Sequence, residues 1–198
     1  MKRVLGRCFL GFYRFRTRAT GKVFSLLSAG SFASFGPRSV LQPPIRLNGE
    51  HRIAIGKGVY VGSNSWLQVL EHEGSGVALA LGDGTSIVGA CVLSAAQSVT
   101  IGRDVLIARN VYVADHVHAF GDRSRPVIKQ GIDRVGPVEI GDGAWLGENV
   151  VVGPGVRIGR NAVIGANAVV LEDVPDFAVA VGAPARVVRM VDASRSTT

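Results

Sequence analysis

The sequence predicts an all-β fold: a single-stranded parallel β-helix with a basic helical segment at its N-terminus. Three observations predict it. An aliphatic residue recurs at every sixth position over a long stretch, glycine is abundant with 26 residues, and aromatic residues make up only 7% of the 198. A period of six with small residues suits a narrow interior of stacked short strands, whereas helices repeat near every 3.6 residues. The length suffices for one domain with a continuous core.

The clearest repeat covers residues 140–175. Its aliphatic positions are all Ile, Leu or Val, namely Ile140, Leu146, Val152, Ile158, Ile164 and Val170. Glycine follows the first five, at Gly141, Gly147, Gly153, Gly159 and Gly165. We expect the aliphatics to point inward and the glycines to adopt backbone conformations that a Cβ would forbid. Three units make a coil of about 18 residues, and stacked coils pair as parallel strands.

The same period returns earlier in shorter runs that begin at Ile55, Leu81 and Ile101. It shifts phase across 68–80 and between Val99 and Ile101, where we expect small loops. The long interruption is 114–137, after which the repeat resumes near Val138. A long loop on a rigid scaffold is a common place for functional residues.

The N-terminal segment 1–36 carries no such repeat and has a different charge. Residues 1–49 hold nine basic and no acidic side chains, so the remaining chain, with 13 basic and 15 acidic, is slightly acidic. On a helix, the basic stripe and the apolar stripe fall on opposite sides. The basic stripe is Arg3, Arg7, Arg14 and Arg18, and the apolar one is Leu5, Cys8, Phe9, Phe12 and Phe15. This amphipathic segment either lies on an anionic membrane surface or packs on the coils or a neighbouring subunit. Nucleic acid is a less favoured partner, because no known binding module is present.

The remaining boundaries follow from composition. Residues 176–190 are expected to end the coils with a turn and a closing strand or helix, and 191–198 to form a polar tail. The predicted division is therefore 1–36, 37–190 and 191–198. Cys8 and Cys91 are far apart, which favours a reducing cytoplasm over a disulfide scaffold. No apolar run of membrane-spanning length occurs, and arginines interrupt any secretory signal.

Three motifs resemble the hexapeptide-repeat acyltransferases, in particular the galactoside and maltose acetyltransferase group of sugar O-acetyltransferases. The segment Ile140-Gly141-Asp142-Gly143-Ala144-Trp145-Leu146-Gly147 is similar to an IGD-x-x-WIG coil, the run 161–170 to AVIGAGSVV, and 182–188 to GNPAKVI. A fourth segment, Asp115-His116-Val117-His118, is similar to the D-H-x-H loop of enzymes that acetylate surface polysaccharides. The resemblance covers roughly 80–190 and implies a left-handed coil and a homotrimer with sites between subunits.

The resemblance implies that His116 is the catalytic base. A sugar hydroxyl is a poor nucleophile, so a positioned base must take its proton during attack on a thioester, and imidazole suits this near neutral pH. His118 is the second candidate. Either Asp115 or Asp122 is expected to orient the imidazole.

The donor implied by the resemblance is acetyl-CoA. Its pantetheine arm is expected along Trp145, Gly147, Ala166 and Asn167, in a groove shared with a neighbouring subunit. Two further residues, Arg186 and Arg189, match positions that meet the nucleotide phosphates.

Some residues depart from the family pattern. Glu172 stands where a lysine is usual, Glu148 stands where a small residue is usual, and 90–96 lacks the asparagine of the galactoside enzymes. These changes leave the acceptor open. The predicted function is O-acetylation of a sugar hydroxyl on a surface-polysaccharide or lipid-linked glycan at the cytoplasmic side of a membrane. The alternatives are an antibiotic acetyltransferase, a non-catalytic subunit, or a zinc hydratase of the γ-carbonic anhydrase type.

The zinc alternative is weak because it needs three histidine ligands around an open position. The chain has only His51, His72, His116 and His118, and none follows the Trp145 coil. No metal site is predicted.

Overall fold

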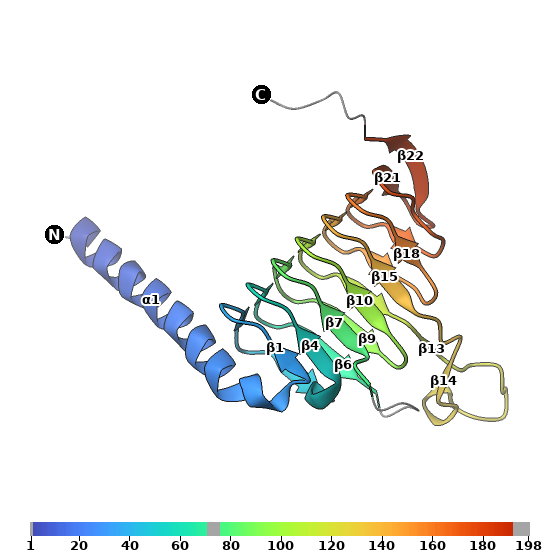
Figure 1. The fold of residues 1–198 in the computed structure, drawn as a ribbon, viewed down its shortest axis with the longest axis horizontal. Helices are drawn as coiled ribbons and strands as arrows, with labels where there is room; N and C mark the ends of the chain where they lie inside the picture. The colour runs from blue at the N-terminus through green and yellow to red at the C-terminus, as the bar shows by residue number, and fades with distance from the viewer. Residues whose placement is uncertain (1, 71–75, 192–198) are drawn as a thin grey trace.

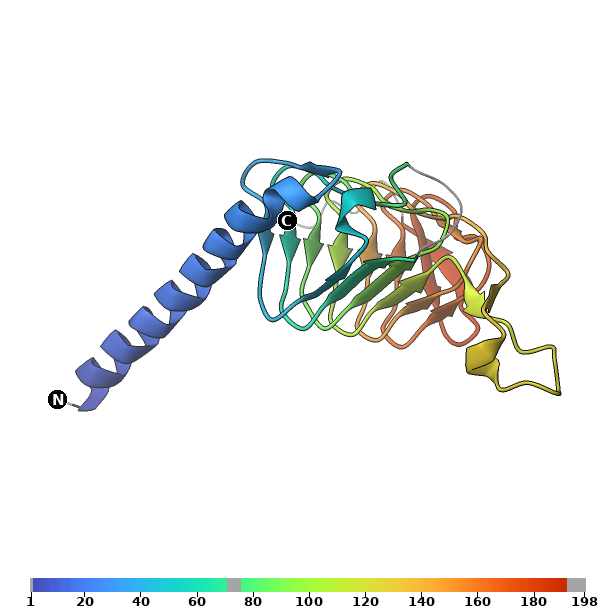
Figure 2. The ribbon, with the colours of Figure 1, turned by 90° about the horizontal axis from the view of Figure 1, so that it is seen from below.

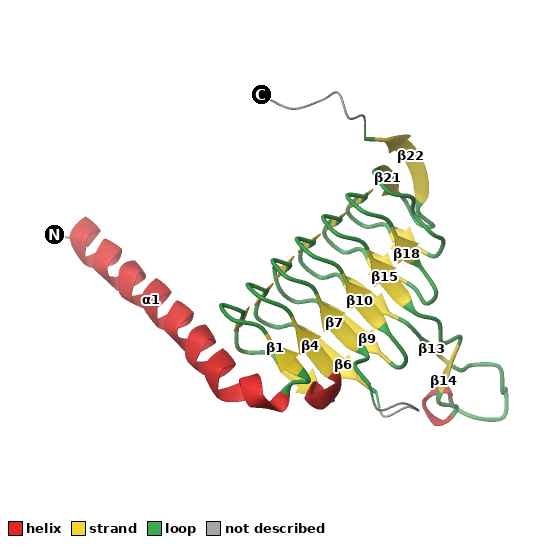
Figure 3. Ribbon diagram, viewed as in Figure 1, coloured by secondary structure: helices red, strands yellow, loops and turns green. Residues whose placement is uncertain are grey.

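The computed structural model describes residues 2–70 and 76–191. It shows a stack of coils with one long helix at the N-terminal end (Figures 1 and 3). Residues 71–75, inside the predicted loop 68–80, lie outside the described residues. So does the predicted tail beyond Val191.

Three sheets form the walls of the stack, and each complete coil contributes one parallel strand to each sheet. Sheet A contains β1 (Ser34–Phe35), β4 (Ile53–Ile55), β7 (Leu79–Leu81), β10 (Val99–Ile101), β15 (Val138–Ile140) and β18 (Arg157–Ile158). Sheet B contains β2 (Val40–Leu41), β5 (Tyr60–Val61), β8 (Ser86–Ile87), β11 (Leu106–Ile107), β16 (Trp145–Leu146), β19 (Val163–Ile164), β21 (Ala178–Val181) and β22 (Arg186–Met190). Sheet C contains β3 (Arg46–Asn48), β6 (Trp66–Val69), β9 (Val92–Ala95), β12 (Tyr112–Ala114), β17 (Val151–Val152) and β20 (Val169–Val170).

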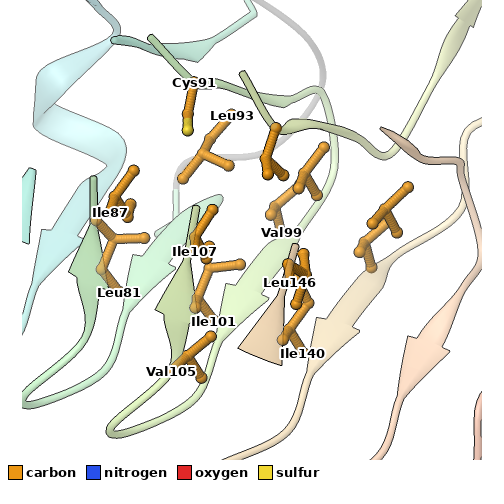
Figure 4. Packing of buried hydrophobic residues seen from close by; sticks show 14 of the residues in the cluster. Leu81, Ile87, Cys91, Leu93, Val99, Ile101, Val105, Ile107, Ile140 and Leu146 are labelled. Atoms are coloured by element: carbon orange, nitrogen blue, oxygen red, sulfur yellow. The ribbon is translucent and has the colours of Figure 1, made fainter. Parts of the chain in front are cut away.

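The core runs along the axis of the stack as rows of aliphatic side chains. Figure 4 shows one row with Leu81, Ile101 and Ile140 and another with Ile87, Ile107 and Leu146. The six aliphatics of the 140–175 repeat are all buried, as are the small residues four positions after each. The predicted six-residue period and its inward-facing positions are confirmed. Each row buries apolar surface that no single coil could hide alone.

The expected backbone role of the glycines in the 140–175 repeat is wrong. The glycines that follow the aliphatics do not have the positive φ that only a residue without Cβ adopts freely. They are required because the next coil approaches closely: a Cβ on Gly147 would lie 2.7 Å from the backbone N of Ala166, and one on Gly159 would lie 2.3 Å from the backbone N of Asp176. The left-handed corners come two residues later, at Gly143, Asn149, Gly155, Asn161 and Asn167. Asparagine tolerates that conformation better than most residues.

The N-terminal segment forms α1 (Lys2–Ser28), followed by the 3-10 turn η1 (Ala29–Ser31). The predicted N-terminal helix is confirmed. Only its C-terminal part touches the coils: Ser25 Oγ accepts a hydrogen bond from the backbone N of Leu41 at 2.8 Å. The rest projects away from the stack (Figures 1 and 2), and it leaves large apolar side chains such as Phe9, Phe12 and Phe15 exposed. The helix ends before residue 36, and sheet A begins at Ser34.

The long interruption leaves the stack between β12 and β15, as expected. It contains an antiparallel pair, β13 (Val117–His118) with β14 (Ile132–Asp133), and the 3-10 turn η3 (Val127–Lys129). A further 3-10 turn, η2 (Glu50–Arg52), precedes β4. At the C-terminal end β22 pairs antiparallel with β21, so a closing strand ends the coils.

Candidate active site

The 114–137 loop begins with a buried acid–histidine pair. Asp115 and His116 directly follow β12 and are 0% and 8% exposed. The Nδ1 of His116 lies 2.8 Å from Oδ1 of Asp115. Three backbone N–H groups of the turn after β9 also donate to this carboxylate, from Ala96 at 2.8 Å and from Gln97 and Ser98 at 2.7 Å each.

These contacts fix the charge of Asp115 and the tautomer of His116. Burial by itself raises the pKa of the Asp115 carboxyl, but the hydrogen bonds from His116 and the three backbone N–H groups outweigh it, so the pKa is lower than usual. An ionised carboxylate only accepts hydrogen bonds, so Nδ1 of His116 must donate. In the neutral imidazole, Nε2 then carries the free lone pair that a general base needs.

His116 lines a groove of about 350 Å³ on the outer face of sheet C. The groove extends from β12 toward the C-terminal coils, and apart from His116 it is lined by Tyr112, Ala114, Val117, His118, Val151, Val152, Gly153, Pro154 and Leu171. Burial raises the pKa of the Tyr112 hydroxyl, and the negative charge of Asp115 adds to the effect. A mostly apolar groove next to an oriented imidazole suits an acyl chain that reacts at one end.

The other loop candidates are exposed and do not share the buried contacts of this pair, although His118 lines the same groove as His116. His118 is exposed on β13. Asp122 accepts hydrogen bonds from the backbone N and the hydroxyl of Ser124, at 2.8 and 2.6 Å. Of the two carboxylates considered as partners of the imidazole, Asp115 is therefore the one in contact with His116.

The predicted donor-binding residues lie on sheet B and at the corner that leads from sheet B to sheet C. Trp145 is 49% exposed on β16, and Gly147 follows that strand beside Ala166. Asn167 is part of a row of asparagines, because its Oδ1 accepts a hydrogen bond from Nδ2 of Asn149 at 3.0 Å. Within one chain, His116 thus follows a strand of sheet C, whereas Trp145 belongs to sheet B and the other predicted residues to the corner beside it.

The two arginines extend the same sheet. Arg186 and Arg189 are exposed on β22, which closes sheet B next to β21. The guanidinium of Arg186 lies 3.3 Å from Oε1 of Glu172, the residue that departs from the family pattern. An exposed pair of this kind is weak and leaves Arg186 able to bind another anion.

Sequence reasoning missed the turn 96–98, whose backbone amides hold Asp115. No side chain in this turn signals that role, because the amides act through the backbone. Within the described residues, no group of three or more His, Cys, Asp or Glu side chains could hold a metal ion; His72 lies outside them. None of the described helices has the length and apolar character needed to cross a membrane.

Comparisons with known proteins identify the family. A family model described as bacterial transferase hexapeptide (six repeats) matches residues 137–172. The galactoside O-acetyltransferase of Escherichia coli K12 is 36% identical over 161 residues, which cover 81% of this chain and 65% of that protein. A solved structure, a galactoside acetyltransferase in complex with coenzyme A, superposes with a TM-score of 0.58 at 31% identity, over 85% of this chain and 69% of that one. The chain belongs to the hexapeptide-repeat acyltransferase family.

A second bacterial relative is named for lipopolysaccharide biosynthesis. WbbJ of Escherichia coli K12, a candidate lipopolysaccharide-biosynthesis O-acetyl transferase, is 34% identical over 103 residues, which cover 49% of this chain and 53% of that protein. The chain spans about half the length of the curated relatives it matches, 44% of one and 53% of another. The predicted family is confirmed.

Proposed function

We propose that the protein is an acetyl-CoA-dependent O-acetyltransferase that modifies a sugar hydroxyl of a surface-polysaccharide or lipid-linked glycan. The observation that carries the proposal is the buried Asp115–His116 pair at the edge of an apolar groove. The relatives support the substrate class, because one is named for galactosides and another for lipopolysaccharide.

In the proposed reaction, Nε2 of His116 removes the proton of the acceptor hydroxyl while its oxygen attacks the thioester carbonyl. The tetrahedral intermediate collapses, the carbon–sulfur bond breaks, and the imidazolium returns the proton to the CoA sulfur. The products are the acetyl ester and free CoA. Asp115 remains ionised and stabilises the imidazolium, as in other acid–histidine pairs.

The donor site is proposed to be shared between subunits of a homotrimer. The groove beside His116 on sheet C forms one half, and Trp145 on sheet B of a neighbour, with Gly147, Ala166 and Asn167 at the adjoining corner, forms the other. Arg186 and Arg189 then meet the phosphates of acetyl-CoA. This arrangement agrees with the positions of the two groups within one chain, where His116 follows a strand of sheet C and Trp145 lies on sheet B. The coils are proposed to wind left-handed, as the motif resemblance implies.

Release of free thiol from acetyl-CoA, measured with a panel of sugars, tests the proposed reaction. His116→Ala should lower kcat by about 10²- to 10⁴-fold, the usual contribution of a general base, while His118→Ala should retain most activity. Thiol release with antibiotic hydroxyls but with no sugar would contradict the acceptor class. Full activity in His116→Ala would contradict the mechanism.

Subunit complementation tests the shared site. We expect His116→Ala and Trp145→Ala to be weak enzymes alone, but co-expression of the two chains should recover activity. In randomly mixed trimers about a quarter of the interfaces combine an intact His116 with an intact Trp145 from the neighbour. No recovery, or an active monomer in solution, would show that the site lies within one chain.

The projecting part of α1 is proposed to bring the enzyme to the inner face of a membrane. Its exposed aromatic side chains and its arginines, without any acidic residue, match the chemistry of an anionic lipid surface. Sedimentation with phosphatidylglycerol vesicles should retain the protein, whereas Arg3→Glu/Arg7→Glu should release it and Arg157→Glu on the coils should not. Equal retention of all three proteins would leave packing on a neighbouring subunit as the role of α1.

A further inference from the structure

On the N-terminal side of His116, the outer face of sheet C carries a row of polar side chains that the proposed mechanism does not use. Strand register aligns Asn48, Gln68, Ser94 and Ala114 in one row. Ala114 directly precedes the Asp115–His116 pair. The row therefore leads across three strands to the catalytic candidate.

The polar row is ordered by its own contacts. Gln68 Nε2 donates to Ser94 Oγ at 2.6 Å, and Asn48 Nδ2 donates to the carbonyl oxygen of Val69 at 3.3 Å. Ser94 is only 1% exposed, so its hydroxyl accepts from Gln68 and fixes that amide without itself facing solvent. The two amide side chains retain their carbonyl oxygens as acceptors. Such paired donors and acceptors recognise hydroxyl groups.

An aromatic residue stands beside this row. Trp66 occupies the neighbouring row of the same face, between Arg46 and Val92. The guanidinium carbon of Arg46 lies 5.8 Å from the centre of the Trp66 ring, which restricts the indole. Trp66 also lines a hollow of about 350 Å³ together with Pro44, Ile45, Arg46, Asn64, Ser65 and Val92. An aromatic wall with a few fixed polar groups is typical of a small-molecule site.

The two sides of His116 differ in what they can bind. Beyond Ala114 the row continues with Gly153 and Leu171, where a Cβ on Gly153 would lie 3.1 Å from Leu171 Cδ2. That apolar side is the proposed position of the donor arm. The attacking hydroxyl must reach the thioester carbonyl from outside the donor arm, so the polar side is the one left for the acceptor.

We infer that Asn48, Trp66 and Gln68, the last held in place by Ser94, form an acceptor subsite for a saccharide of more than one ring. The inference rests on the proposed acetyl transfer. The ring nearest Gln68 presents its hydroxyl to His116, and the following rings lie over Asn48 and Trp66. At about 4.8 Å between strands, the row from Asn48 to Ala114 is about 14 Å long, which exceeds a single hexopyranose ring.

Calorimetric titration without acetyl-CoA tests this subsite directly. The probes are oligosaccharides of glucose, galactose, mannose and N-acetylglucosamine, each with two to six rings, beside the matching monosaccharides. At least one oligosaccharide should bind about tenfold more tightly than its monosaccharide, and Trp66→Ala and Gln68→Ala should each lose about that factor, as expected for one or two lost contacts. Thr100→Ala, on the outer face of sheet A, is the matched control and should bind normally.

The inference is overturned if no oligosaccharide binds more tightly than its monosaccharide, or if both variants bind like the unchanged protein. Thermal unfolding of each variant shows whether it is folded. Thiol release separates the two proposals: if acetyl transfer is wrong, no sugar promotes release by the unchanged protein. If only the subsite is wrong, release proceeds and the acceptor KM of Trp66→Ala and Gln68→Ala stays unchanged.

Discussion

The outer face of sheet C differs on the two sides of the 114–137 loop, although the interior behind it does not. Toward the N-terminus the row that contains Ala114 is polar, with Gln68 and Ser94. Toward the C-terminus the same row holds Gly153 and Leu171. Behind both parts the side chains are aliphatic and buried. The repeat thus specifies the core alone, and the outward positions are free to differ between the donor side and the acceptor side.

The first prediction tests whether the interior is equally packed on both sides of the loop. Leu67→Ala in β6 and Leu146→Ala in β16 should each lower the free energy of unfolding by about 2–5 kcal/mol, because both side chains are fully buried and leave a cavity. Urea unfolding measures this. Leu5→Ala on the exposed part of α1 is the control and should change it by less than about 0.5 kcal/mol. A large loss of unfolding free energy in only one of the two coil variants would show that the interior is packed differently on the two sides of the loop.

The coils could be predicted from the sequence because their period records which residues point inward. The run from Ile140 to Val170 has six of six aliphatic positions and needs no tertiary information. The glycines between them could not be explained in this way. Their small size is needed for the approach of the next coil, as at Gly159 and the backbone of Asp176, and the sequence does not show how closely coils approach.

The catalytic candidate was predictable in part. The position of His116 at the start of the interruption followed from the pattern, but two carboxylates, Asp115 and Asp122, remained open as its partner. Asp115 is held beside His116 by the turn 96–98, which precedes it by a whole coil and donates hydrogen bonds through backbone amides. The sequence does not show that contact. The row that joins Gln68 to Ser94 was missed for a related reason: its register depends on the loop that separates β6 from β7.

The second prediction concerns the carboxylate at the boundary between the two sides. Asp115→Asn should lower the free energy of unfolding at pH 7 by about 1.5–3 kcal/mol, because the amide replaces charge-assisted hydrogen bonds from Ala96, Gln97 and Ser98. The pKa of Asp115 is lowered in the folded protein, so its contribution is complete above the unfolded pKa, near 4, and is lost as the pH falls through the folded value.

Urea unfolding at several pH values follows this contribution. The difference between the unchanged protein and Asp115→Asn should therefore shrink as the pH falls below about 4. Asp122→Asn is the comparison variant: Asp122 is exposed and its pKa is lowered only by hydrogen bonds from Ser124 in the same loop, so its effect on stability should be smaller at every pH. A pH-independent difference would mean that the charge of Asp115 does not hold the start of the loop.

The third and smallest prediction compares the two sides directly through kinetics. Leu171→Val removes one methylene from the apolar groove, where each buried methylene contributes about 0.8 kcal/mol. The KM for acetyl-CoA should therefore rise by at most about fourfold, with the acceptor KM unchanged. Gln68→Ala should do the reverse, since it lies on the polar side. If either variant raised both KM values equally, the two ligands would share one surface, and the polarity difference across His116 would not separate donor from acceptor.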